Sequence, residues 1–148
     1  MADETVELAL EFQAEPNAAD AQVVADGLLS VLAADLGAPR REPFALILRR
    51  QDDSVAGGLV GKVLFSDLHV DQLWLHESAR CHGHGRRLME EAEAHGVRQG
   101  CASAYLNTMS STVLEFYLEI GFYELGRVKD FPVGHTVYFL RKDLGGAS

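Results

Sequence analysis

Cysteines and long hydrophobic runs are both scarce in this sequence. Its 148 residues include only two cysteines, Cys81 and Cys101, too few for a disulfide framework, and we expect two free thiols. No stretch approaches the roughly 18 to 20 unbroken apolar residues that a membrane-spanning helix needs. The chain begins with acidic residues, whereas a secretory signal begins with basic ones and continues with an apolar segment. We therefore expect a cytoplasmic protein without a membrane span.

Basic residues are also in short supply. Thirteen Lys and Arg against 22 Asp and Glu give a net charge of −9. A surface of that sign repels nucleic acid phosphates and anionic lipids, and no basic stripe with interleaved aromatic residues is present. The composition therefore predicts no nucleic-acid or membrane partner, and it mildly favours cationic small molecules.

Length and hydrophobic patterning predict a single α/β domain over residues 1–148 with a mixed sheet. The hydrophobic content of 47% is typical of globular proteins, and 148 residues suffice for one core. Periodicity and turn residues predict strands over 5–14, 44–49, 55–65, 68–76, 102–108, 123–128 and 135–141, and helices over 17–36, 83–99 and 112–120.

Several details of these elements can be tested directly. The first strand alternates apolar residues with Glu7 and Glu11, and the first helix could break at Gly27. Leu88, Met89, Ala92 and Gly96 are expected to face inward from the second helix. Thr112 and Glu115 have the spacing of a capping box for the third helix. Strand 102–108 follows a crossover helix, which favours parallel pairing with strand 68–76.

The segment 80–86, RCHGHGR, lies between a strand and a helix and carries the strongest chemical signal. Gly83 and Gly85 allow a tight turn, so that successive backbone N–H groups and the helix N-terminus can point at one anion. The segment lacks the Gly-Lys-Ser/Thr of a P-loop and the third glycine of the dinucleotide fingerprint. It is therefore predicted to bind a pyrophosphate, although the same glycines could serve only a sharp turn.

Two ordered motifs resemble the GNAT superfamily of N-acetyltransferases, and in particular its small bacterial members. Arg-x-x-Gly-x-Gly after a strand is similar to that family's acetyl-CoA loop, and 116–122, FYLEIGF, is similar to its Phe/Leu-Tyr-x-x-x-Gly-Phe segment. The last strand, from Gly134 to Lys142, also resembles the family. The resemblance implies the acyl-CoA N-acyltransferase fold, with about seven strands and three to four helices. It also implies transfer of acetyl from acetyl-CoA to a primary amine in a ternary complex, without a metal.

The resemblance also implies a set of cofactor-binding residues. The backbone of one strand would hold the pantetheine arm, the glycine loop would bind the pyrophosphate, and one residue stands where many members have an Asn. These residues are Leu73, Trp74, Leu75, Cys81, His82, Gly83, His84, Gly85, Arg86 and Ser110. Ser110 is the residue at the Asn position, and its shorter side chain could reach the cofactor through water.

Catalytic roles are expected for Tyr117 and Glu77. Tyr117 matches the family's general-acid tyrosine, and a phenol can donate to the leaving thiolate while a strand amide stabilises the oxyanion. The same position also suits a core aromatic. The attacking ammonium must lose a proton. Glu77 is the preferred base, with His76 and His135 as other candidates, and each could equally be an exposed polar residue.

Three further expectations concern the acceptor and competing functions. Trp74, His76 and the terminal hairpin are expected to border the acceptor site, and the acceptor could be a polyamine, an aminoglycoside, or a protein N-terminus or lysine. A homodimer is plausible from the resemblance alone. Two other functions stay open: a zinc site made by His76, Cys81, His82 and His84, and a non-catalytic module that binds coenzyme A or a protein.

Overall fold

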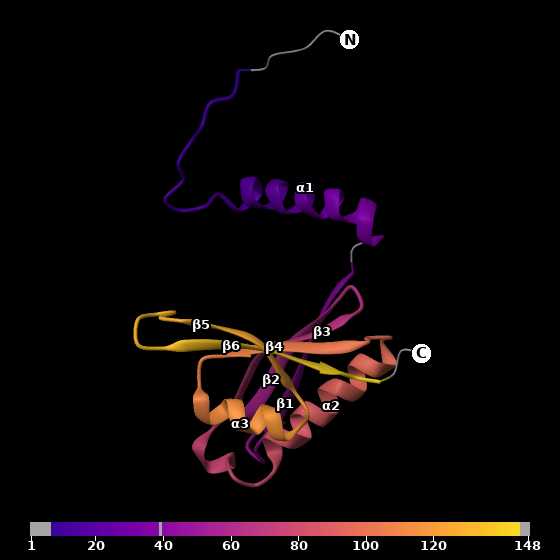
Figure 1. Cartoon of the computed structure of the whole chain (residues 1–148), viewed down its shortest axis with the longest axis vertical. Coiled ribbons are helices and arrows are strands. Elements are labelled where there is room, and N and C mark those ends of the chain that lie inside the picture. The colour runs from indigo at the N-terminus through magenta and orange to yellow at the C-terminus, as the bar shows by residue number, and fades with distance from the viewer. Residues whose placement is uncertain (1–6, 39, 146–148) are drawn as a thin grey trace. The chain divides into compact units, whose positions relative to one another are not determined.

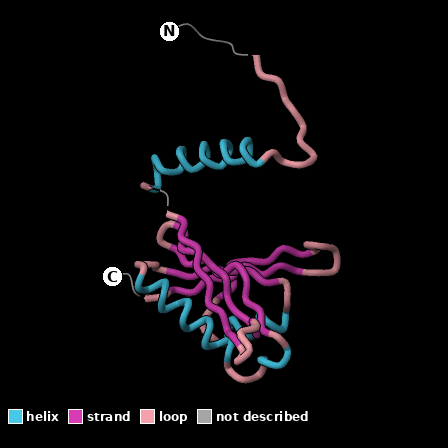
Figure 2. Tube along the Cα trace, turned by 180° about the vertical axis from the view of Figure 1, so that it is seen from behind, coloured by secondary structure: helices cyan, strands magenta, loops and turns pink. Residues whose placement is uncertain are grey.

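The computed structural model describes residues 7–38 and 40–145, which divide into two compact units. The first lies before Arg40 and contains one helix, α1 (Ala18–Leu36). The second begins at Arg40 and contains the following elements in chain order (Figures 1 and 2): β1 (Arg41–Arg49), β2 (Val55–Leu64), β3 (Asp67–Leu75), the 3-10 helix η1 (Glu77–Ala79), α2 (His84–Arg98), β4 (Ser103–Thr108), α3 (Ser111–Glu119), β5 (Tyr123–Lys129) and β6 (Thr136–Asp143).

The second unit is built on a mixed six-stranded sheet with the order β1-β2-β3-β4-β6-β5. Within the described residues, β3 and β4 pair in parallel, through Asp67–His69 and Ser103–Tyr105, and the other neighbouring pairs are antiparallel. Helix α2 connects the two parallel strands along the chain. The parallel pairing expected for strand 102–108 is therefore confirmed. Both α2 and α3 lie on the same side of the sheet (Figure 1).

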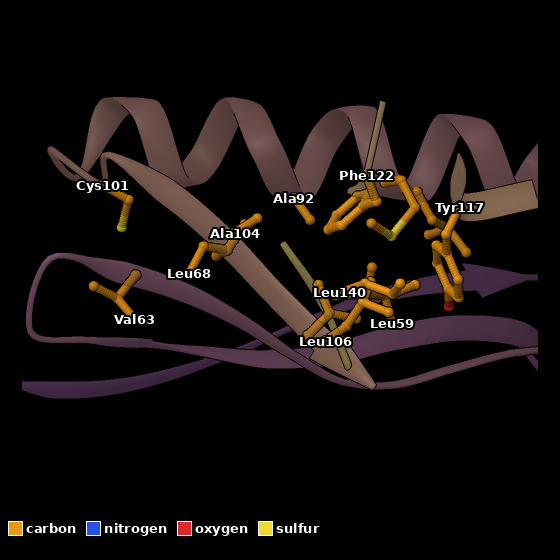
Figure 3. Close-up of a cluster of buried hydrophobic side chains, with 13 residues drawn as sticks. Leu59, Val63, Leu68, Ala92, Cys101, Ala104, Leu106, Tyr117, Phe122 and Leu140 are labelled. Carbon is orange, nitrogen blue, oxygen red and sulfur yellow. The ribbon is translucent and has the colours of Figure 1, made fainter. Parts of the chain in front are cut away.

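The core of the second unit lies between α2 and the sheet. Leu88, Met89, Ala92 and Gly96 are the buried residues of α2, which confirms the predicted inward face. They pack against strand residues that include Leu59, Val63, Leu68, Leu106 and Leu140 (Figure 3). Each large aliphatic side chain buried in this way contributes about 1.5–3 kcal/mol relative to exposure. The sheet is therefore anchored to one helix, and β3 and β4 are fixed at their paired ends.

The first unit departs from the sequence-based expectation. Residues 7–14 form no strand, and residues 5 and 6 of the predicted strand lie outside the described residues. Leu8, Leu10 and Phe12 are 89%, 103% and 90% exposed. The alternation is present, but none of the described residues pairs with this segment as a strand. The expected helix is confirmed as α1 and continues through Gly27 without a break, although it has no buried residue.

Two smaller predictions are also corrected. The sheet has six strands in the described residues, where about seven were expected, because residues 7–14 do not join it. The capping box at Thr112 and Glu115 is wrong, because α3 begins at Ser111 and Ser110 is its N-cap. The Ser110 side chain accepts a hydrogen bond from the backbone N–H of Val113 at 3.2 Å. The serine at position 110 thus satisfies one of the free N–H groups of the first turn, that of Val113.

Candidate functional site

The two parallel strands separate beyond their paired ends, and the space between them forms a pocket. No β3–β4 partners follow His69 and Tyr105, although β3 continues to Leu75 and β4 to Thr108. The pocket measures about 400 Å³ and is lined by Val70, Asp71, Gln72, Leu73, Leu106, Asn107, Thr108, Met109, Val113 and Tyr117. Separation of two central strands leaves backbone N–H and C=O groups of β3 without a neighbouring strand on that side. These groups can bind an extended ligand.

A register irregularity in β3 brings a carboxylate into the pocket. Gly61 pairs with Val70 and Val60 with Gln72, so Asp71 is passed over in the β2–β3 register. Such a bulge redirects the extra residue and bends its strand. Asp71 lines the pocket, and its Oδ1 accepts a hydrogen bond from Lys62 Nζ at 2.8 Å. The sequence analysis did not identify Asp71, because a bulge depends on the register of two strands.

Tyr117 lies where α3 meets the pocket. It is the buried residue of α3, with 5% of its surface exposed, and it belongs to both the core cluster and the pocket lining. Its ring contacts Phe116 and Phe122, with centroids 5.3 Å and 5.8 Å away. Figure 3 shows the hydroxyl oxygen at the tip of this ring, at one end of the buried cluster. Burial raises the pKa of Tyr117 to about 12, so the phenol stays protonated at neutral pH.

The glycine-containing segment forms the N-terminus of α2. Gly83 is the N-cap, with φ of 81° and ψ of 5°, and Cys81 also has a positive φ of 65°. None of the described side chains caps this end of α2, and the first turn of the helix contains no acidic residue. The first N–H groups of a helix lack internal partners and carry a partial positive charge. An open, uncapped N-terminus of this kind is suited to a phosphate group.

The backbone requires glycine at position 83 but not at position 85. A Cβ atom at Gly85 would lie 3.6 Å from Phe116 Cζ and 3.7 Å from Leu75 Cδ1, which are ordinary contacts. Alanine is therefore compatible with the packing there. At Gly83 no atom of the part of the chain that the structure describes lies within 4 Å of an added Cβ, but the left-handed backbone favours glycine. The turn itself depends on Gly83.

The predicted pantetheine-binding strand residues differ in their surroundings. Leu73 and Leu75 pack against the core, and Leu73 also lines the pocket. Trp74 is 52% exposed, and its ring lies 6.2 Å from that of His76. The Leu75 carbonyl accepts a hydrogen bond from Arg80 Nε at 3.0 Å, which ties the end of β3 to the glycine segment.

The base candidates lie outside the pocket lining. Glu77 is exposed in η1, and His135 is exposed between β5 and β6. His76 is the N-cap of η1, where its Nδ1 accepts a hydrogen bond from the backbone N–H of Ser78 at 3.1 Å. None of the three is among the pocket residues, and the base assignment stays a prediction.

The residues considered for zinc do not gather around one point. Among residues 7–38 and 40–145, no three His, Cys, Asp or Glu side chains are placed to share a metal ion. The rings of His82 and His84 are 6.4 Å apart. Among the residues that the structure describes, no helix has the length and apolar character needed to cross a membrane.

Comparisons with known proteins place these features in a family. The acetyltransferase (GNAT) family matches residues 9–122. An acetyltransferase of Agrobacterium fabrum is 30% identical over 121 residues, 82% of this chain and 88% of the relative. The blasticidin-S acetyltransferase of Streptomyces morookaense is 36% identical over 104 residues, 70% of this chain and 76% of the relative.

Solved structures give the same result. A crystal structure from Agrobacterium tumefaciens, assigned as an acetyltransferase, has a TM-score of 0.85 and 27% identity. The match covers 92% of this chain and 99% of that one. The family match, the sequence relatives and the mixed α/β fold agree with the two motifs found in the sequence. The chain belongs to the GNAT family of acetyltransferases.

Proposed function

We propose that this protein transfers the acetyl group of acetyl-CoA to a primary amine by direct attack in a ternary complex. The observation that carries the proposal is the position of Tyr117, a buried phenol lining the pocket between the separated ends of β3 and β4. Such a pocket can hold a thioester beside a proton donor. The proposal needs no covalent enzyme intermediate, and it assigns no nucleophilic role to either cysteine.

The chain offers suitable groups for each part of the acyl donor. The uncapped N-terminus of α2 and the backbone of residues 81–86 would bind the pyrophosphate, with Gly83 setting the turn. The β3 backbone from Leu73 to Leu75, where β4 no longer pairs, would hydrogen-bond the pantetheine arm as an added strand does. Ser110 already uses its hydroxyl as the cap of α3, so we propose only a water-mediated contact there.

The proposed reaction forms one bond and breaks another. The amine nitrogen attacks the thioester carbon, the C–N bond forms, and the C–S bond breaks to release a thiolate. A β3 amide such as that of Leu75 would stabilise the developing oxyanion. The Tyr117 hydroxyl would donate to the leaving sulfur. Because its pKa is about 12, well above that of an ordinary thiol, we propose a hydrogen bond that stabilises the thiolate rather than full proton transfer.

The attacking amine must arrive without its extra proton. Glu77 is exposed at the end of β3, so it would act on the amine through water rather than by direct contact with the pocket. Asp71 lies in the pocket lining beside Gln72 and Asn107. Its carboxylate is paired with Lys62 Nζ at 2.8 Å, and it would hydrogen-bond a cationic acceptor as a second partner of that pair. The acceptor class we propose is therefore a small cationic amine, and the relative named for blasticidin S supports a small molecule.

The alternative, a module that binds coenzyme A without turnover, is not favoured by the relatives named as acetyltransferases. The test is thiol release from acetyl-CoA in the presence of a panel of amines, with the acetylated product identified by mass spectrometry. Tyr117→Phe should reduce release while coenzyme A binding by calorimetry persists. Tyr123→Phe, on an exposed edge strand, is the matched control. Equal rates for Tyr117→Phe and the unchanged protein would overturn the role of the phenol.

A further inference from the structure

The segment 7–16, here called the arm, exposes apolar side chains in the alternating pattern of a half-buried strand. Leu8, Leu10 and Phe12 are almost fully exposed and share one parity, whereas Glu7, Glu11 and Glu15 share the other. Such alternation is the pattern of a strand with one buried and one solvated face. Burial of these side chains against a partner would be favourable, because each large apolar side chain removed from water contributes about 1.5–3 kcal/mol.

The second unit has an edge that matches the arm. β1 lies at one end of the sheet, and of the described residues only β2 pairs with it. An unpaired edge presents a row of backbone N–H and C=O groups to which another strand can add. β1 has nine residues, Arg41–Arg49, about the length of the arm.

The two faces of β1 match the two faces of the arm in chemistry. Phe44, Leu46 and Leu48 are half-buried and pack against the core, so an adjacent strand with apolar residues would extend that layer. On the other parity, β1 carries Arg41 and Arg49 near its two ends, both exposed. If the arm's apolar residues join the core layer, its glutamates fall on the face that holds these arginines.

The charge distribution of the chain strengthens this match. Eight acidic residues and no Lys or Arg precede Arg40, so nearly all of the net charge of −9 lies in the first unit. The β1 strand and its immediate neighbours instead contain four arginines, Arg40, Arg41, Arg49 and Arg50. Opposite charges of this kind favour association between the arm and β1, and they disfavour contact between two arms.

The helix that follows the arm also has apolar residues without cover, and the sheet offers a matching surface. Val24, Leu28 and Val31 of α1 are all exposed, and an isolated helix is only marginally stable in water without packing. On the sheet face away from α2, Ile47, Val60 and Trp74 are exposed on the neighbouring strands β1, β2 and β3. Exposed apolar side chains on neighbouring strands provide a surface suited to an apolar partner.

We infer that the arm of one copy adds as a strand to β1 of a second copy, with α1 covering the exposed sheet face, in a reciprocal two-copy exchange. Each chain has one arm and one acceptor edge, so two copies close the exchange with two-fold symmetry and leave neither unpaired. The family match begins at residue 9, and the match to the Agrobacterium tumefaciens structure covers more of the chain than the second unit contains. The family match thus includes residues 9–16 of the arm, and the structural match includes part of the first unit.

The unbroken form of α1 favours a second copy over the same chain. Nineteen helical residues span about 28 Å, and α1 continues through Gly27. For the arm to lie antiparallel beside its own β1, the short connectors at both ends of α1 would have to double back along the helix. A parallel crossover beside its own β1 is the competing arrangement. It produces a monomer, and the mass in solution separates the two.

The experiment is sedimentation velocity on the full chain, on Leu10→Asp and on Ala9→Asp. Both variants add one carboxylate to the arm, but Leu10 is on the apolar parity and Ala9 on the glutamate parity. We expect a dimer for the full chain and for Ala9→Asp, and a dissociation constant raised at least tenfold for Leu10→Asp. A monomeric full chain would overturn the inference in favour of docking within one chain. A dimer that Leu10→Asp leaves equally tight would also overturn it, because the interface would then lie elsewhere.

A second experiment checks the exchange between chains directly. In a Cys81→Ser background, one copy carries Ala9→Cys and a differently sized tagged copy carries Ala45→Cys, which lies on the outward parity of β1. Because the register between the arm and β1 is not fixed in advance, Glu7→Cys and Glu11→Cys are tested in place of Ala9→Cys in the same way. Oxidation should produce a cross-link between the two differently tagged chains for at least one arm position. A further sample carries both cysteines on one chain; if cross-links form only in that sample, and at the mass of one chain, the exchange is wrong.

Discussion

The ring of Tyr117 meets the ring of Phe122 nearly edge-on, with centroids 5.8 Å apart and planes inclined by 67°. Phe122 lies just beyond α3, and its backbone N–H donates to the Tyr117 carbonyl at 3.0 Å. The two contacts fix the phenol at the pocket wall, where burial raises its pKa and keeps it protonated at neutral pH.

Tyr117→Phe should therefore reduce kcat by about 10- to 100-fold, at or below the lower limit of the roughly 100- to 10,000-fold typical of a positioned proton donor, because a hydrogen bond replaces full transfer. The affinity for coenzyme A should change less than twofold, since the ring and its contacts remain. Steady-state kinetics and calorimetry measure the two effects. A raised KM for acetyl-CoA with unchanged kcat would instead indicate that the hydroxyl serves only in binding.

The raised pKa of Tyr117 also predicts a pH effect on stability. The folded value is about 12 and the unfolded value is near 10, so the phenol's contribution is complete below pH 10 and is lost as pH rises through 12. A difference of about two units between the folded and unfolded pKa values corresponds to about 2–3 kcal/mol of unfolding free energy. Urea unfolding at pH 8 and pH 11 should show a smaller alkaline loss for Tyr117→Phe than for the unchanged protein. Identical losses would show that the phenol ionises freely in the folded state.

Gly83→Ala should weaken acetyl-CoA binding through the backbone of the α2 N-terminus. An L residue held at φ of 81° costs about 1 kcal/mol or more, and relaxation of that strain would move the N–H groups away from the pyrophosphate. We expect KM for acetyl-CoA to rise at least fivefold. Gly100→Ala is the matched control, since Gly100 has φ of 83°, has no atom within 4 Å of an added Cβ and follows the other end of α2. Equal KM changes for both variants would indicate general destabilisation.

The two cysteines should react differently with a thiol reagent. Cys81 is exposed beside the proposed pyrophosphate site, whereas Cys101 is buried and burial raises the pKa of its thiol. One thiol per folded chain should react rapidly, and saturating coenzyme A should slow that reaction. The Cys101→Ala variant should retain both the rapid reaction and its protection. Rapid labelling that coenzyme A leaves unchanged would place the ligand away from Cys81.

Asp71→Asn should raise KM for a cationic acceptor by about five- to tenfold, equivalent to roughly 1 kcal/mol, with little change in KM for acetyl-CoA. The carboxylate lines the pocket and balances the charge of Lys62, so its loss removes an attraction for the ammonium group and leaves the Lys62 ammonium to repel it. Glu124→Gln is a suitable control, because it breaks another surface ion pair, with Arg127 at 2.7 Å, outside the pocket lining. A neutral acceptor analogue should not distinguish the Asp71 variant from the unchanged protein.

The regular part of the fold could be predicted because local patterns there agree with the packing. The spacing of Leu88, Met89 and Ala92 defines one helix face, and that face is the one buried on the sheet. The glycine pair and the aromatic segment after β4 could be recognised for a similar reason, since each is short and contiguous. The aromatic segment identified Tyr117, and the structure places this residue in the pocket lining.

The features that sequence reasoning missed depend on relations between distant segments. Asp71 enters the pocket because the β2–β3 register passes over it, which no local pattern encodes. The cap of α3 is Ser110 rather than Thr112, and two nearby hydroxyl residues give equally good local signals. Residues 7–14 have a strand's alternation, but a strand also needs a neighbour, and among the described residues none pairs with the arm.

The most direct test of the proposed function is the reaction itself. The full chain is incubated with acetyl-CoA and a panel of small cationic amines, thiol release is followed over time, and products are identified by mass spectrometry. The proposal predicts release that depends on the amine and yields an N-acetylated product in equal amount. Acetyl-CoA that binds in calorimetry yet is hydrolysed at the same slow rate with or without every amine would contradict it.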